Sequence, residues 1–181
     1  MHAATGQVPP DLPARDGLAV PLRQEFFDAR AAWAGGPYAE PARALVAARA
    51  DLVREMFIRY DALVPAVLST SDGWVVTHGE PHARNVMRTN DGGIKLIDWD
   101  TVALAPRERD LWLLEPRTDE DWAAYRCATS ADPVALELCR LRWPLTDICI
   151  FTATFRAPHV DDENTRVAWR GLRGYLEGTP E

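Results

Sequence analysis

Three side chains in one stretch of the sequence have the types and spacing needed for magnesium-dependent phosphoryl transfer. Glu80 and Asn85 lie in the segment THGEPHARN (residues 77–85), and Asp98 follows in LIDWD (residues 96–100). Carboxylate and amide oxygens are the ligands that Mg²⁺ prefers, and a neighbouring carboxylate can orient an acceptor hydroxyl. The spacing therefore predicts a site in which Asn85 and Asp98 hold magnesium and Glu80 orients a hydroxyl group.

A β-hairpin is expected to bring Asn85 and Asp98 together. Apolar residues predict strands over 86–88 and 94–97, and the intervening segment 89–93 contains an Asp-Gly pair, which is a strong hairpin signal. A hairpin places the start of one strand beside the end of the next. The amide of Asn85 and the carboxylate of Asp98 can therefore converge.

The rest of the chain reads as mostly helical. Apolar residues at three- and four-residue intervals predict a long helix over 41–68, with Pro65 as a candidate break. One further strand is predicted over 74–77. Further helices are predicted over 23–33, 107–114, 120–127, 133–155 with a candidate kink at Pro144, and 161–176. We therefore expect one α+β domain over 1–181, in which a small hairpin-centred sheet lies among helices and the proline-rich residues 1–22 form an extended lead-in.

Composition excludes several classes of protein. The 27 acidic residues outnumber the 20 basic ones, which argues against a nucleic-acid partner. The sequence has neither a signal-peptide pattern nor an apolar run near the roughly 18 residues of a membrane span, so no membrane association is expected. The three cysteines, Cys127, Cys139 and Cys149, form no C-x-x-C pair and read as buried thiols, which favours a cytoplasmic location.

Three motifs together resemble a known family. His78, Glu80 and Asn85 repeat the intervals of the protein-kinase catalytic loop H-R-D-x-x-x-x-N, with Glu in place of Asp. With IDWD at 97–100 and PRERDLW at 106–112, the chain resembles the aminoglycoside phosphotransferase and choline-kinase-like superfamily. The resemblance is good over roughly residues 40 to 115 and implies the C-terminal lobe of a protein-kinase-like fold.

The resemblance implies a role for each acidic and amide side chain of the motif. Glu80 would take the catalytic-base position, although Asp is commoner there and the extra methylene shifts the carboxylate. Asn85 and Asp98 would hold Mg²⁺ for ATP, the co-substrate, and Asp100 is a candidate for a further contact to metal or substrate.

The flanking residues would support the loop. His78 and His82 would shape it, and Asp110 would hydrogen-bond its backbone. An alternative remains open from the residues alone, because His78, Glu80 and His82 offer three zinc ligands for a metal-dependent hydrolase. That alternative lacks a fourth ligand and the H-E-x-x-H spacing.

The nucleotide-binding half of a kinase is missing from the sequence. There is no G-x-G-x-x-G loop, and the sole lysine, Lys95, lies inside the predicted hairpin. The chain therefore resembles the C-terminal lobe with the N-terminal lobe absent. We expect a phosphotransferase acting on a hydroxyl of a small polar molecule, such as an aminoglycoside in antibiotic resistance, in a truncated or split form whose N-lobe comes from another chain or a homo-oligomer.

A second hypothesis is a non-catalytic kinase-lobe remnant that acts as a binding module. It predicts an apolar surface, suited to a protein partner, on the lead-in and on the residues near the hinge to the missing lobe. Binding of Mg-ATP separates the two hypotheses, because only the phosphotransferase requires it. The acceptor substrate cannot be read from the sequence, since acceptor pockets are built from variable helices and loops.

Overall fold

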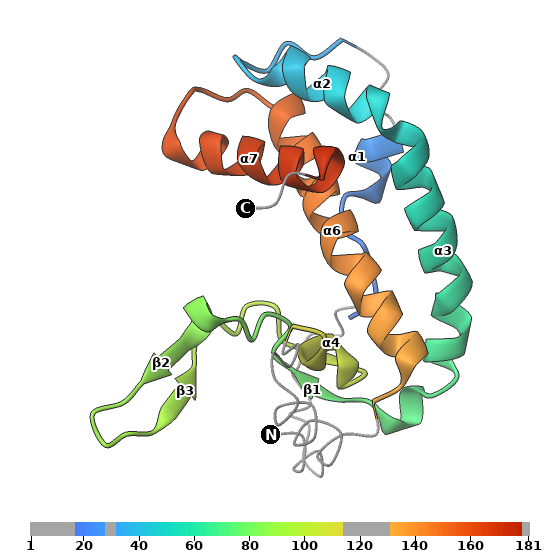
Figure 1. Ribbon diagram of the computed structural model, residues 1–181, viewed down its shortest axis with the longest axis vertical. Helices are drawn as coiled ribbons and strands as arrows, with labels where there is room; N and C mark the ends of the chain where they lie inside the picture. Colours follow the sequence, from blue (N-terminus) through green and yellow to red (C-terminus); the bar gives the residue numbers. More distant parts are fainter. Residues whose placement is uncertain (1–16, 28–31, 114–130, 179–181) are drawn as a thin grey trace. The chain divides into compact units, whose positions relative to one another are not determined.

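The computed structural model describes residues 17–27, 32–113 and 131–178. The chain divides into two compact units, one formed by Met1–Ala19 with Leu63–Arg140 and the other by Val20–Ala62 with Leu141–Glu181. Most of the predicted lead-in, the predicted helix over 120–127 and Cys127 lie outside the described residues. The described part is mostly helical with two small antiparallel sheets, which confirms the predicted α+β class (Figure 1).

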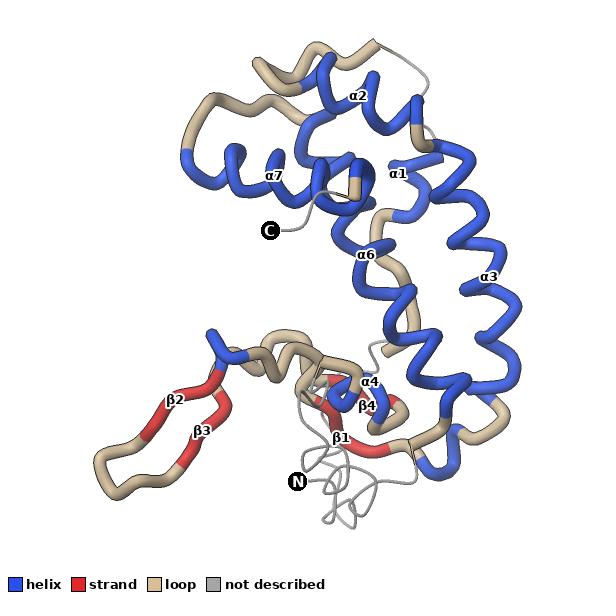
Figure 2. The backbone as a smooth tube through the Cα atoms, in the orientation of Figure 1, coloured by secondary structure: helices blue, strands red, loops and turns tan. Residues whose placement is uncertain are grey.

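The first unit contains both sheets. Strand β1 (Val75–Thr77) pairs antiparallel with β4 (Ala103–Ala105), and β2 (Val86–Arg88) pairs with β3 (Ile94–Leu96) (Figure 2). The pairing of β1 with β4 buries Thr77 completely. Two two-stranded sheets therefore replace the single hairpin-centred sheet that the sequence predicted.

The β2–β3 hairpin agrees with its prediction closely. Val86 lies opposite Leu96 and Arg88 opposite Ile94, so the strand pairing begins directly after Asn85. The N–H of Thr89 donates to the carbonyl oxygen of Gly93 at 2.9 Å and closes the connecting turn. Glycine suits this turn because Gly92 has a φ of +83°, a conformation that side chains disfavour.

Strand β4 was not predicted. Its residues Ala103, Leu104 and Ala105 alternate buried, exposed and buried, which is the strand period of two. Two alanines supply too little apolar bulk to stand out in a sequence window. The short helix α4 (Glu108–Leu111) follows, and all four of its residues are buried.

Helices α3 (Ala50–Leu68) and α6 (Pro133–Arg156) each contribute residues to both units. The long helix predicted over 41–68 is interrupted, because α2 (Ala39–Ala48) ends at Arg49, whose φ of −113° departs from helical geometry. The candidate break at Pro65 was wrong, since α3 continues through it and the Ser69 N–H still donates to the Pro65 carbonyl. Helix α6, which was predicted over 133–155, is continuous through Pro144.

The second unit is helical. It comprises α1 (Arg23–Phe27), α2, parts of α3 and α6, and α7 (Glu163–Glu177). An N-terminal capping box begins α7, in which the Asp162 carboxylate accepts from the Thr165 N–H. Helices α2 and α7 contact each other. Within the described ranges, no helix combines the length and apolar character needed to cross a bilayer.

Candidate active site

The loop after β1 is tied to helix α4 through one carboxylate. Asp110 Oδ2 accepts from the backbone N–H of His78 at 3.0 Å, and its Oδ1 accepts from that of Gly79 at 2.7 Å. Asp110 is buried, so these bonds form away from water, where charged acceptors are strong. This geometry fixes the direction in which the chain leaves β1 and enters the loop that carries Glu80.

His78 links this loop to the end of β3. Its Nε2 lies 2.8 Å from the carbonyl oxygen of Ile97, and its Nδ1 accepts from the Glu80 N–H at 3.2 Å. The ring is buried, and its edge packs against Trp99 with centroids 4.6 Å apart. The Ile97 carbonyl can only accept, so the neutral ring carries its proton on Nε2. Both ring nitrogens are thus engaged within the protein.

Asn85 joins the loop to the hairpin. Its side-chain amide donates to the carbonyl oxygen of Glu80 at 3.0 Å, and its own carbonyl accepts from the Ile97 N–H at 3.0 Å. The first bond uses the amide nitrogen and leaves the amide oxygen for another partner. The second bond sets Asn85 beside the residue that precedes Asp98. The structure therefore brings the backbone of Asn85 close to the end of the hairpin at which Asp98 follows.

Asp98 lies among negative charges at the end of this hairpin. A hydrogen bond with Asp100 raises the pKa of Asp98, and the negative charges of Asp100 and Glu80 raise it further. Asp98 is exposed and has a φ of +64°, in the left-handed region that non-glycine residues seldom adopt. Such a cluster of carboxylates favours either a proton or a metal cation.

The donor set fits magnesium better than zinc. Magnesium is commonly held by one or two carboxylates together with phosphate oxygens and waters, and the hydrogen-bonded pair of Asp98 and Asp100 offers carboxylates of that kind. Among the residues that the structure describes, no three His, Cys, Asp or Glu side chains lie close enough to hold a metal. The zinc alternative was therefore wrong, because His78 directs both ring nitrogens to the backbone.

Glu80 and His82 face each other at the loop surface. His82 Nε2 lies 3.9 Å from Glu80 Oε2, and both side chains are about one-third exposed. At this distance the contact is a weak, solvent-screened one rather than a hydrogen bond. The Glu80 backbone, by contrast, is held on both sides, through its N–H by His78 and through its carbonyl by Asn85.

Sequence reasoning missed Arg109, whose side chain holds the loop through buried hydrogen bonds. Its Nη1 donates to Thr77 Oγ1 at 2.8 Å and its Nη2 to the Thr101 carbonyl at 2.7 Å. Thr101 in turn donates through its hydroxyl to the carbonyl oxygen of His78 at 2.8 Å. The sequence did contain a sign of this role, because Arg109 lies beside Asp110 in a short segment flanked by apolar residues. A charged side chain that is buried in such a segment needs hydrogen-bond partners within the protein.

Comparison with known proteins begins with the family models. Residues 2–139 match the model described as the phosphotransferase enzyme family. The curated protein StrN of Streptomyces griseus is 31% identical over 153 residues, which cover 79% of this chain and 43% of StrN.

Two solved structures share the fold. Both are of spectinomycin phosphotransferase APH(9)-Ia, which is 17% identical to this chain. The complex with ADP and spectinomycin gives a TM-score of 0.66 over 91% of this chain, and the AMP-bound complex gives 0.70 over 88%. In each case the match covers 53% of the solved chain, so this chain spans about half the length of the relatives it matches.

Proposed function

This chain belongs to the phosphotransferase enzyme family, and on that premise we propose that it forms the acceptor-orienting, magnesium-holding half of a small-molecule kinase. The reaction would transfer the γ-phosphoryl group of ATP to a hydroxyl of a small polar molecule. The observation that supports the proposal is the backbone hydrogen bond from Ile97 to Asn85, because it sets the backbone of Asn85 beside the residue that precedes Asp98.

The proposed magnesium ligands are the amide oxygen of Asn85 and the carboxylate of Asp98, with Asp100 as a further contact. When bound, magnesium would neutralise charge on the phosphate oxygens. The chain's own contribution is to hold the ligands in place. Asn85 keeps its orientation because its amide nitrogen is bonded to the Glu80 carbonyl, and Asp98 is held next to a second carboxylate by its hydrogen bond with Asp100.

Glu80 is proposed to accept a hydrogen bond from the acceptor hydroxyl. Its side chain is one methylene longer than the aspartate that is commoner in the family. The backbone bonds of Glu80 to His78 and Asn85 support the role, because they fix the starting point from which the longer side chain reaches. His78, His82 and Asp110 are proposed as supports for the loop rather than as groups that touch substrate.

The proposal requires a nucleotide-binding half outside the 181 residues. This chain spans about half of its relatives, so we propose that a nucleotide lobe is supplied by a longer protein, by another chain or by a second copy. The ADP and spectinomycin bound by APH(9)-Ia support ATP and a hydroxyl-bearing, aminoglycoside-like acceptor as the substrates. We propose that the protein binds neither nucleic acid nor a membrane and that it acts in the cytoplasm.

Manganese binding tests the metal site without requiring the other lobe. We would titrate the 181-residue chain with Mn²⁺ and follow paramagnetic broadening of backbone amide signals by NMR. The expected result is selective broadening at Asn85 and Asp98 that excess Mg²⁺ reverses and that Asp98→Asn weakens at least tenfold. The control Asp72→Asn removes the same charge at an exposed turn and should leave the broadening unchanged. Uniform broadening, or broadening that survives Asp98→Asn, would refute the site.

Nucleotide binding tests the other part of the proposal. In a thermal-shift measurement on this chain together with the lobe that completes it, Mg-ATP should raise the melting temperature. The reason is that a ligand that binds only the folded state stabilises that state. The same measurement with Asp98→Asn should give a smaller shift. An equal shift in both proteins would argue against magnesium coordination at Asp98.

A second function, as a binding module without catalysis, is favoured by one observation. The hairpin and the residues after it expose several large apolar side chains: Val86, Met87, Ile94, Ile97 and Trp99. Their surface would suit a protein partner. The apolar lead-in surface that this hypothesis also predicts falls mostly outside the described residues. This function predicts a chain that binds a protein partner but gives no selective Mn²⁺ broadening.

A further inference from the structure

Asp98 has a backbone conformation that its neighbours must maintain. Its φ of +64° lies in the left-handed region, which residues other than glycine disfavour. Among the non-glycine residues that the structure describes, only Leu22 shares a positive φ. A residue keeps such a conformation where the surrounding structure prevents it from relaxing. The contacts of the neighbouring residues therefore decide where the Asp98 carboxylate points.

The residue before Asp98 is fixed by hydrogen bonds to the loop and to the hairpin. The Ile97 carbonyl oxygen accepts from His78 Nε2 at 2.8 Å, and the Ile97 N–H donates to the Asn85 carbonyl oxygen at 3.0 Å. Both backbone polar groups of Ile97 are thus engaged. The chain therefore enters Asp98 from a fixed direction.

Trp99 fixes the chain on the other side of Asp98, through its side chain and its backbone. Its indole Nε1 donates at 3.0 Å to the carbonyl oxygen of Leu96, three residues earlier, so the side chain bridges Ile97 and Asp98. The Trp99 carbonyl oxygen accepts from the Val102 N–H at 3.1 Å. The segment from Leu96 to Trp99 is closed by the indole, and Asp98 lies inside it.

A second contact determines how the indole of Trp99 is oriented. The ring centroids of Trp99 and His78 lie 4.6 Å apart with the planes at 60°, an edge-to-face arrangement that aromatic pairs favour. Because 44% of Trp99 is exposed, burial alone does not hold the ring. The contact with His78 and the hydrogen bond to Leu96 hold it together. Phenylalanine could supply the ring, but only tryptophan also supplies the N–H donor that a carbonyl oxygen requires.

We propose that Trp99 is a positioning residue for the proposed magnesium site, because its indole holds Asp98 in the left-handed conformation. This inference rests on the proposed function, since it takes Asp98 as a magnesium ligand. Without the indole N–H, Asp98 can relax to a negative φ, which swings its Cβ and moves its carboxylate away from that of Asp100. The apparent affinity for a metal then falls with the fraction of molecules that keep the binding conformation.

Trp99→Phe tests this role, since it keeps an aromatic ring for His78 and removes the indole donor. In metal-free protein, the NMR signals of Asp98 that report φ, namely the three-bond HN–Hα coupling and the Cα and Cβ shifts, should move toward values for negative φ. The Mn²⁺ affinity, followed by broadening at Asn85, should fall about fivefold, the factor that corresponds to one hydrogen bond. Both changes are expected in a protein that remains folded.

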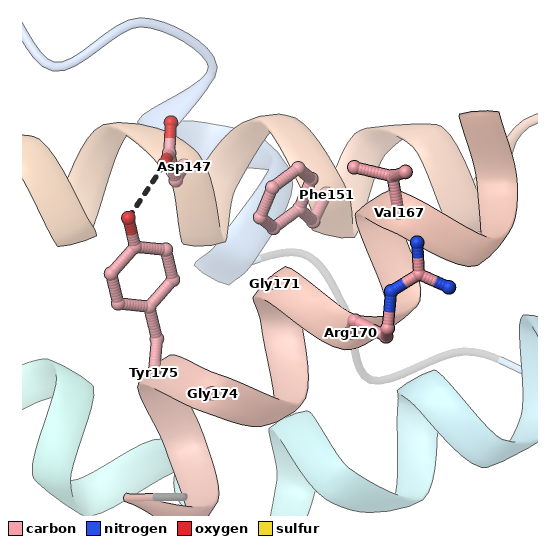
Figure 3. A pocket seen from close by; sticks show the side chains of 7 residues that line it. All are labelled: Asp147, Phe151, Val167, Arg170, Gly171, Gly174 and Tyr175. Carbon is pink, nitrogen blue, oxygen red and sulfur yellow. Dashed lines mark hydrogen bonds between the residues drawn. The ribbon is translucent and has the colours of Figure 1, made fainter. Parts of the chain in front are cut away.

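Trp143→Phe is the matched control. The Trp143 Nε1 donates at 3.0 Å to the Tyr175 hydroxyl, which in turn donates to Asp147 at a pocket of the second unit (Figure 3). The substitution therefore removes an indole hydrogen bond of the same length that has no part in the proposed metal site. It should lower the stability of the protein while leaving the Asp98 signals and the Mn²⁺ affinity unchanged.

A double-mutant cycle distinguishes an effect through Asp98 from a general one. In an Asp98→Asn background, Trp99→Phe should cause no further loss of Mn²⁺ affinity, whereas an equal loss in both backgrounds would show that Trp99 acts elsewhere. Unchanged Asp98 signals or an unchanged Mn²⁺ affinity in Trp99→Phe would overturn the proposal. A parent protein that binds no Mn²⁺ would refute the magnesium site itself, and the metal-free signals of Asp98 would then still show whether Trp99 holds its conformation.

Discussion

The guanidinium of Arg109 lies directly against the backbone of Gly79, so that a Cβ on Gly79 would come within 2.3 Å of Arg109 Nη2. Gly79 also has a φ of +96°, which side chains disfavour. Steric space and backbone conformation therefore both require glycine here. The loop that carries Glu80 can lie close to its buried arginine only because this residue has no side chain.

Gly79→Ala should consequently destabilise the protein by about 1–3 kcal/mol, from the strained φ and the displaced guanidinium. Urea denaturation followed by circular dichroism measures the change. The matched control is Gly73→Ala, where an added Cβ meets nothing within 4 Å, and its stability should stay within about 0.5 kcal/mol of the parent. Similar losses in the two variants would contradict the packing of Arg109 against the loop.

Asp110→Asn should cost about 2 kcal/mol of stability. Its carboxylate accepts from the N–H groups of both His78 and Gly79, whereas an amide has one acceptor oxygen and would point its NH₂ at the other N–H. Urea denaturation gives the energy, and hydrogen exchange should accelerate at the His78 or Gly79 amide. Asp72→Asn, at an exposed turn, serves as the control for loss of one charge. Unchanged exchange at both amides would show that the anchor is dispensable.

The acid titration of Asp98 should be displaced upward. The neighbouring Asp100 raises the pKa of Asp98, so the folded protein keeps this proton at pH values where the unfolded chain has lost it. Native protein then binds more protons than unfolded protein, and stability falls as the pH rises from the ordinary aspartate pKa through the raised one. NMR of the side-chain carboxyl carbons measures the titration directly.

Asp100→Asn should bring the pKa of Asp98 back toward its ordinary value, because it removes both the hydrogen bond and the negative charge that raise it. Saturating Mg²⁺ should lower the pKa of Asp98 in the parent protein for the opposite reason, since a cation favours the ionised carboxylate. A titration of Asp98 that neither the substitution nor the metal shifts would count against the acidic cluster as a metal site.

Cys149 should resist alkylation in the folded protein. Burial raises the pKa of this thiol to about 12, so almost no reactive thiolate exists at pH 8. Treatment with iodoacetamide followed by peptide mass mapping should find Cys149 and the buried Cys139 unmodified in native buffer and modified in concentrated urea. Rapid labelling of Cys149 without denaturant would mean that the helix α6 region opens readily.

The hairpin, and with it the position of Asn85 beside Ile97, could be predicted because the signals are local. An Asp-Gly turn between two apolar runs fixes the pairing, and the pairing alone carries Asn85 to the neighbourhood of Asp98. By contrast, the interruption at Arg49 leaves no mark in the sequence, since arginine is a good helix former. Pro65, the candidate break, lies within the continuous helix α3, and Pro144, the candidate kink, lies within the continuous helix α6.

The parts that escaped prediction depend on contacts between distant segments. Strand β4 exists because Ala105 pairs with Val75, thirty positions earlier in the chain. The hydrogen bond from Arg109 to Thr77 joins helix α4 to strand β1. The hydrogen bond from Tyr175 to Asp147 joins helix α7 to helix α6. No window of sequence contains both members of such pairs, and their residue types are ordinary when taken singly.

The closed turn between β2 and β3 also sets a limit on how this protein can evolve. The turn from Thr89 to Gly93 is largely exposed, so most substitutions there should be tolerated. Insertion or loss of one residue is different, because a register slip turns every strand side chain to the opposite face and moves Asn85 away from its neighbour Ile97. Homologues that keep this hairpin should therefore differ in the residue types of the turn but not in its length.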